Sequence, residues 1–169
     1  MKRSILVAIL AVMVCGAASA QRLFVLDSEK VFKSLDEYNA AITTLDNLSK
    51  DLQKKVDEKY AEVETLYNSY MSQRETLSAA TRQTVEQQIL AKEEAAGKYQ
   101  ESLFGPEGEL MKQRKALIEP IQKRVFDAIE LYSKLNGYDV AIDKASNTTL
   151  LYSSAAADHT QQIIDMLKK

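Results

Sequence analysis

The side chains that most often carry out catalysis or bind metals are scarce in this 169-residue chain. It contains one histidine, His159, and one cysteine, Cys15. A lone histidine with no cysteine and no carboxylate cluster beside it lacks the partners of a metal site, so we expect a solvated surface residue. No spacing joins a serine, a histidine and an acid, and no thiol follows Cys15, so nucleophilic catalysis lacks its components.

Glycine placement and charge exclude two further kinds of site. None of the glycines beyond residue 20 belongs to a phosphate-binding loop that follows a strand; they stand at positions 97, 105, 108 and 137. Acidic pairs such as Asp57-Glu58 fit solvated helix faces. Without Lys2 and Arg3 the 22 basic residues become 20, against 24 acidic ones, which gives a net charge of about −4 and no basic block for nucleic acid. We expect no enzyme, no cofactor and no metal.

The first twenty residues have the order of a secretion signal. A basic start precedes the apolar run 5–14, and Ala18-Ser19-Ala20 has the pattern of a cleavage site. The apolar run is too short to span a bilayer of roughly 30 Å, so residues 1–20 are predicted to be a removed signal peptide. A second interpretation, in which Cys15 carries the lipid of a lipoprotein, is disfavoured by the bulky residues before it.

Two long helical patterns form the middle of the chain. Ser34 and Glu37 suggest a capping box, and no Gly or Pro follows before Thr76, which predicts one helix of about 40 residues or about 60 Å. Apolar residues at steps of three and four form a narrow coiled-coil stripe: Leu45, Leu48, Leu52, Val56, Tyr60, Val63, Leu66 and Tyr70. A turn near Leu77 and an N-cap at Ser78 begin the return helix, so residue i should face residue 154 − i.

The stretch LFGPEGEL, residues 103–110, interrupts the return helix. It faces about Leu48, where the outgoing helix is unbroken, so we predict a break in one helix of the shaft. Pro106 is expected in the first turn of the resumed helix, where its missing N–H costs little. Gly105, Pro106 and Gly108 are therefore candidates for a hinge or bulge, and a tolerated insertion without a role is an equal alternative.

The two ends of the chain carry β-type segments. LFVLD at 23–27 is predicted to be a buried strand, and the segments 138–143 and 148–152 are predicted to form a β-hairpin. A last helix is expected to start at Asp158, with Gln161 completing a capping pair. Three strands make a poor independent core, so several chains should join. The residues expected to form this body and its oligomer contacts are Leu23, Phe24, Val25, Leu26, Val140, Ile142, Leu150 and Leu151.

In this order the segments resemble the Skp/OmpH family of periplasmic chaperones. The matching stretches are FVLDSEKVF, LSAATRQ, IEPIQKRVFDAIE, GYDVAID and DHTQQIIDMLKK. The resemblance implies an α+β, mostly α fold, in which a long antiparallel helical hairpin at 36–118 projects from a small β-rich trimerisation body at 21–35 and 119–169. It also implies a periplasmic homotrimer that holds unfolded outer-membrane β-barrel proteins without ATP.

Near the predicted tip, aromatic and methionine side chains widen the apolar surface beyond one stripe. The candidate contacts with client proteins are Tyr67, Tyr70, Met71 and Leu77. Tyr60 and Tyr99 are expected to fill the interface between the two helices. The basic residues proposed to bind lipopolysaccharide in the best-known members have no evident match, so contact with lipopolysaccharide or membrane is not carried over. A structural coiled-coil spacer or adaptor of the envelope stays open as a second class of function.

Overall fold

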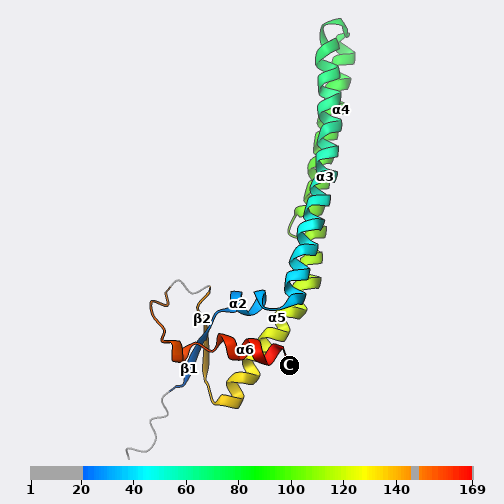
Figure 1. The fold of residues 1–169 in the computed structure, drawn as a ribbon. Coiled ribbons are helices and arrows are strands. Elements are labelled where there is room, and N and C mark those ends of the chain that lie inside the picture. The colour runs from blue at the N-terminus through cyan, green and yellow to red at the C-terminus, as the bar shows by residue number, and fades with distance from the viewer. Residues whose placement is uncertain (1–20, 146–148, 169) are drawn as a thin grey trace, which may run out of the picture. The chain divides into compact units, whose positions relative to one another are not determined.

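The computed structural model describes residues 21–145 and 149–168, and the chain divides into two compact units (Figure 1). The hairpin unit runs from Leu35 to Arg124, and the body unit joins the residues up to Ser34 with those from Val125 onward. The predicted signal peptide and part of the predicted β-hairpin, residues 146–148, lie outside the described residues.

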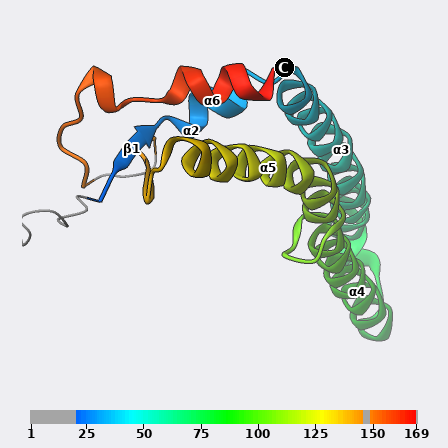
Figure 2. The ribbon, with the colours of Figure 1, turned by 90° about the horizontal axis from the view of Figure 1, so that it is seen from below.

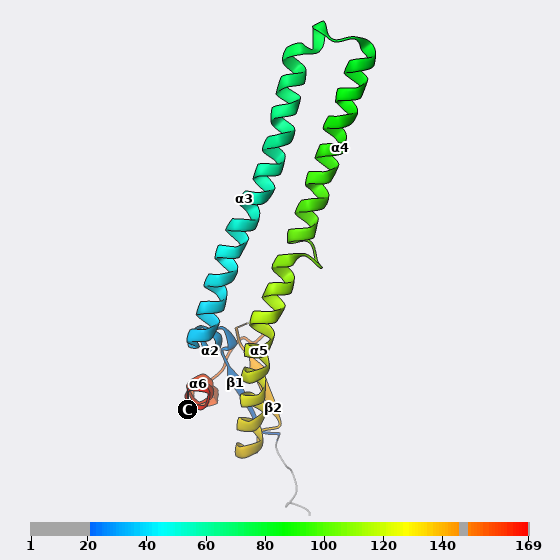
Figure 3. The ribbon, with the colours of Figure 1, turned by 90° about the vertical axis from the view of Figure 1, so that its right-hand side faces the viewer.

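The hairpin unit consists of two long helices that run side by side. Helix α3 (Asp36–Gln73) is unbroken, and a turn of 3-10 helix, Arg74–Thr76, leads to α4 (Ala79–Phe104). Figure 3 shows α3 beside α4, with the break between α4 and α5 (Glu109–Asn136) on that side only. Ser78 caps α4 by accepting a hydrogen bond from the backbone N–H of Thr81, as the sequence predicts.

The start of α3 differs from the prediction. Leu35 is its N-cap residue and makes no side-chain cap. Ser34 ends the preceding helix α2 (Ser28–Lys33), where its hydroxyl donates to the carbonyl of Val31. The predicted capping box is wrong because α2 uses Ser34 for its own last turn. Glu37 instead forms an ion pair with Arg124, at 2.5 Å between Oε1 and Nη1.

The apolar core of the hairpin unit is concentrated beside the break. Leu52, Val56 and Leu103 are buried there, and the partly buried residues around them are Leu48, Tyr99, Phe104 and Leu110. Nearer the turn the helices are linked by polar contacts, among them an ion pair of 3.2 Å between Glu62 and Lys92. This pair obeys the predicted 154 − i register, which confirms that part of the prediction.

The body unit is built on a two-stranded parallel sheet. Strand β1 (Leu23–Leu26) pairs with β2 (Val140–Asp143), with Leu23 opposite Val140 and Leu26 opposite Asp143. Helix α2 packs against α6 (Thr160–Leu167), and Figure 2 shows these two helices side by side. Buried apolar side chains of this unit are Phe24, Val25, Leu26, Val31, Val125, Ile163, Ile164 and Leu167.

The third predicted strand does not form in its described part. Residues 149–152 are not a strand, and Leu151 is 94% exposed. The predicted β-hairpin is wrong because β2 takes its partner from the other end of the chain, in parallel. The other edge of β1 is occupied as well, since Val25 forms an isolated bridge with Asp158.

Candidate functional site

Exposed apolar side chains of the hairpin unit gather in a groove near the turn between α3 and α4. We call it the tip groove; it has a volume of about 520 Å³ and is lined by Tyr67, Tyr70, Met71, Arg74, Glu86, Ile89 and Leu90. Tyr67, Tyr70 and Met71 of α3 follow an i, i+3, i+4 pattern, so they project from one face of that helix, and Arg74 follows in the 3-10 turn. The other three come from α4 and form the opposite wall. The groove is therefore a joint product of the two helices.

Tyr70 lies at the base of the tip groove and is only 6% exposed. Its hydroxyl donates a hydrogen bond to Oε1 of Glu86 on the opposite helix. This bond raises the pKa of Tyr70, and a side-chain hydrogen bond with Tyr70 raises the pKa of Arg74. Tyr70 thus interacts with both Glu86 and Arg74, whose opposite charges compensate each other at the edge of the groove. The remaining lining residues are apolar or aromatic.

The structure separates the four residues predicted to contact clients. Tyr67 and Met71 are half-exposed walls of the tip groove. Leu77 is partly buried in the turn, and Tyr70 lies in the interface between the helices, the place expected for Tyr60. Tyr60 is exposed instead, although its hydroxyl donates to Gln100 across the interface at 3.2 Å.

None of the α4 residues that line the groove was among the predicted contacts, and Leu90 is the exposed apolar residue among them. It is 64% exposed and forms part of the α4 wall. The apolar positions of α4 are sparse, so no stripe marked this residue. Aligning the two helices by the 154 − i rule could have found it, because that rule brings Leu90 next to Glu64 and within one turn of Tyr67.

The break between α4 and α5 is a tightly packed turn. The Gly108 N–H donates to the carbonyl of Gly105 at 2.9 Å, which closes a β-turn with Pro106 at its favoured second position. A Cβ at Gly105 would lie 2.5 Å from the Glu101 carbonyl oxygen, and one at Gly108 would lie 2.7 Å from the Leu103 carbonyl. Pro106 is thus in the turn and not in the first helical turn, because α5 begins only after this turn has closed.

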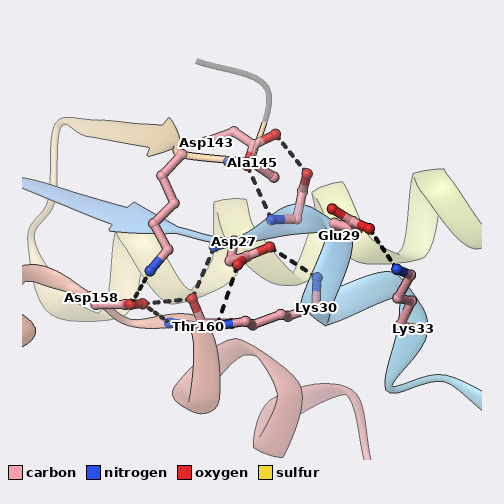
Figure 4. Close-up of polar contacts among 10 residues, drawn as sticks. Asp27, Glu29, Lys30, Lys33, Asp143, Ala145, Asp158 and Thr160 are labelled. Atoms are coloured by element: carbon pink, nitrogen blue, oxygen red, sulfur yellow. Dashed lines mark hydrogen bonds and ion pairs between the residues drawn. The ribbon is translucent and has the colours of Figure 1, made fainter. Parts of the chain in front are cut away.

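A polar junction in the body unit joins the ends of β1 and β2 to the start of α6 (Figure 4). Asp158 binds Lys144 at 2.5 Å and accepts hydrogen bonds from the backbone N–H and hydroxyl of Thr160. The Thr160 hydroxyl oxygen also accepts from the backbone N–H of Asp27 at 2.9 Å. On the β2 side, Asp143 accepts two hydrogen bonds from Ser28. Together these contacts fix both ends of the segment between Lys144 and Asp158.

The electrostatics of the junction follow from these contacts. Burial raises the pKa of Asp158, but hydrogen bonds from Lys144 and Thr160 lower it more, to about 2. The hydrogen bond between Lys144 and Asp158 also raises the pKa of Lys144. The predicted capping pair at α6 is wrong: the N-cap residue is His159, which makes no side-chain cap, and the Gln161 side chain donates to Asp165. Asp158 lies one residue earlier and accepts from the backbone N–H of Thr160.

His159 is not the solvated residue that the sequence analysis predicted. Its side chain is partly buried, with Nδ1 2.6 Å from the Tyr132 hydroxyl and Nε2 3.3 Å from the Tyr138 hydroxyl. The imidazole also lies against the ring of Phe24, at 5.3 Å between centroids. The prediction is wrong because these aromatic partners come from distant parts of the sequence. The histidine belongs to the core of the body unit.

The described residues lack the features of two other kinds of site. Within 21–145 and 149–168, no three or more His, Cys, Asp or Glu side chains are grouped so that they could hold a metal ion. In the same part of the chain, every helix is too short or too polar to cross a membrane.

Known proteins of one family match nearly the whole chain. A family model described as "Outer membrane protein (OmpH-like)" matches residues 22–167. The chaperone protein Skp of Photorhabdus laumondii is 24% identical over 154 residues, which cover 90% of this chain and 89% of the relative. Skp of Photorhabdus luminescens is 23% identical over 155 residues, with the same coverage.

A solved structure shows the same fold. It is a protein from Caulobacter crescentus described as an OmpH-like outer membrane chaperone, with a TM-score of 0.65 at 10% identity over 89% of this chain and 86% of that one. The family match extends over both the hairpin unit and the body unit. The chain therefore belongs to the OmpH-like family of outer membrane proteins.

Proposed function

We propose that the protein is an ATP-independent holdase chaperone of the periplasm, which binds unfolded outer-membrane β-barrel proteins and prevents their aggregation. The match of residues 22–167 to the OmpH-like family carries this proposal, and two relatives named as chaperones support it. Export would depend on residues 1–20 acting as a cleavable signal peptide.

The hairpin unit suits the holding of unfolded chains. A holdase needs an adaptable apolar surface and not an enclosed pocket, because its clients have no fixed shape. The half-exposed Tyr67 and Met71 provide aromatic and thioether surface of this kind. Several weak contacts of this type on one assembly give tight capture without any strong single site.

The assembly that we propose is a homotrimer joined through the body unit. Its large apolar side chains that stay exposed in the single chain are Leu23, Phe126, Leu131, Leu135, Val140, Leu151 and Tyr152. Apolar surface of this extent favours association. Among the predicted contact residues, Phe24, Val25 and Leu26 are buried within the chain and Ile142 and Leu150 partly so. Leu23, Val140 and Leu151 are the ones that can reach a partner.

The hinge role of Gly105, Pro106 and Gly108 stays a prediction. A Cβ at Gly105 or Gly108 would clash with the backbone, so this turn requires glycine at both positions. This requirement favours a functional role of the turn over a tolerated insertion. Bending the shaft at this place would require opening the hydrogen bond between Gly108 and Gly105.

A holding assay separates this function from that of a structural spacer. An unfolded outer-membrane β-barrel protein is diluted from urea into buffer with the purified protein, and aggregation is followed by light scattering. We expect suppression at about three chains per client. A spacer would leave the aggregation unchanged, and that result would refute the proposal. Multi-angle light scattering of the protein alone tests the trimer, and a stable monomer at micromolar concentration would refute it.

A further inference from the structure

We propose that the tip groove binds extended polypeptide segments whose side chains alternate between apolar and polar. In this binding mode one apolar side chain of the segment contacts Tyr67 and the next one on the same face contacts Met71. The polar side chains between them point to solvent.

The spacing of the groove residues supports this binding mode. Tyr67 and Met71 are four residues apart on α3, which corresponds to about 6 Å along the helix axis at 1.5 Å per residue. In an extended segment, side chains on the same face are two residues apart, or about 6.4–6.8 Å. In an extended segment that lies along α3, two successive side chains on the same face can therefore contact Tyr67 and Met71.

The lining of the groove selects uncharged side chains. Leu90 and Ile89 form the wall opposite Tyr67 and Met71, and all four are apolar or aromatic. The charges of Arg74 and Glu86 compensate each other through Tyr70. A charged side chain entering the groove would lose its hydration without gaining an unpaired partner.

An amphipathic helix is the rival occupant, because two antiparallel helices can accept a third one. The groove spans only Tyr67 to Arg74, or about 10.5 Å, which is about two helical turns. Isolated helices shorter than about 12–15 residues are marginal in water, so about half of a bound helix would have to be ordered beyond the groove. About four residues of an extended segment fill the same length. The extended segment therefore orders fewer residues for the same contacts.

The source of the segment rests on the proposed function. Strands of outer-membrane barrels alternate between apolar side chains that face lipid and polar ones that face the lumen. An unfolded barrel protein therefore contains many segments of the required pattern, and a groove with this spacing would recognise them in any of its strands.

Three peptides of identical composition test the inference on the unmodified, full-length protein. Each contains one tryptophan, and their apolar residues are placed in alternation, at helical spacing of three and four, or in one block. The chain itself has no tryptophan, so tryptophan fluorescence reports only on the peptide. We expect the alternating peptide to bind about fivefold or more tightly than the other two. Equal affinities, or a preference for the helical or block pattern, would overturn the inference.

Exposed substitutions then locate the binding site. Met71→Ser and Leu90→Ser should each weaken binding of the alternating peptide by about fivefold. Ile42→Ser is the matched control, because Ile42 is 36% exposed on the same helix as Met71 but outside the groove. Equal weakening by all three substitutions would mean general apolar adhesion and would overturn the inference. Far-UV circular dichroism checks that the variants fold, and the peptide comparison on the unmodified protein decides the question if one does not.

The holding assay, run in parallel, distinguishes the two proposals. If aggregation is suppressed but the alternating peptide has no advantage, the groove inference fails and the proposed function stands. If aggregation proceeds unchanged while the alternating peptide binds best at Met71 and Leu90, the proposed function fails and the groove inference stands.

Discussion

Replacing Asp158 by asparagine is expected to destabilise the body unit at neutral pH and to remove part of its sensitivity to acid. The Asp158 carboxylate binds Lys144 and Thr160, and its side chain is 28% exposed. Its pKa is about 2, below the ordinary 3.8. A carboxyl group whose pKa is lower in the folded state stabilises that state above the unfolded pKa. This contribution disappears as the pH falls through the folded pKa.

The size of the effect follows from the two pKa values. They differ by roughly 1.8 pH units, which corresponds to about 2.4 kcal/mol at 1.36 kcal/mol per unit. More than a quarter of the side chain is in contact with water, so screening reduces this figure to about 1–2 kcal/mol. The free energy of unfolding of the Asp158→Asn variant should therefore lie below that of the unmodified protein by this amount above pH 4. The difference should shrink between pH 4 and pH 2.

Urea unfolding at a series of pH values measures this difference. Near-UV circular dichroism reports on the packed tyrosines Tyr132 and Tyr138 of the body unit. Protein concentration is held constant, because association would otherwise change the apparent stability. Asp51→Asn, an exposed carboxylate on the hairpin, serves as the matched control and should change the free energy of unfolding by less than about 0.5 kcal/mol.

Two results would refute the reasoning. One is a variant as stable as the unmodified protein at pH 7. The other is a stability difference that stays constant down to pH 2, which would show that the carboxylate acts through its shape and not through its charge. A Lys144→Met substitution adds a further check, since it should cost less in the Asp158→Asn background than alone.

Three further substitutions test other parts of the structure by thermal melting. Leu52→Ala should lower the stability of the hairpin unit by about 2–4 kcal/mol, because Leu52 is fully buried in a small cluster; a loss below 1 kcal/mol would contradict this packing. Gly108→Ala should cost about 1–3 kcal/mol, since its Cβ would press on the Leu103 carbonyl; an unchanged melting temperature would show that the turn relaxes freely. His159→Phe keeps the ring but loses the hydrogen bond with Tyr132, and should cost about 1–3 kcal/mol. If His159→Phe were as stable as the unmodified protein or more so, the hydrogen bond between His159 and Tyr132 would not stabilise the body unit.

The helical hairpin could be predicted from the sequence because its helices, cap and turn depend on residues that are close together in the sequence. Leu52 and Val56 belong to the predicted stripe, and both are buried where it expects them. The cap at Ser78 and the pairing of Glu62 with Lys92 depend on a single turn and on helix geometry alone. In a hairpin, fixing the turn fixes which residues face each other along the whole shaft.

The body unit was harder to predict because its contacts join distant residues. An alternating strand pattern at 138–143 does not say which segment will pair with it, and a nearby apolar run at 148–152 is the simplest choice. The structure selects β1 instead. The place of His159 has the same origin, since its partners Phe24 and Tyr132 lie on β1 and α5, far from it in the sequence.

Three residues that line the tip groove, Tyr67, Tyr70 and Met71, are among the predicted client contacts, and their role stays a prediction. Tyr67 and Met71 were identified because they widen an apolar stripe on one helix, and single-helix patterns show this directly. The opposite wall depends on which face α4 turns toward α3, so Leu90 was missed. The burial of Tyr70 depends on its bond to Glu86, a partner 16 residues away.

The parallel pairing of β1 with β2 also has a consequence for the order in which the chain folds. The paired segments are 117 residues apart, whereas Tyr60 and Gln100, which are hydrogen-bonded across the hairpin, are 40 residues apart. Short loops close faster and at lower entropic cost. In a chain that is synthesised from the N-terminus, the helical hairpin would thus form before β1 can pair with β2. The sheet cannot form until β2 has been synthesised. Strand β1 is therefore synthesised before the hairpin but becomes ordered after it.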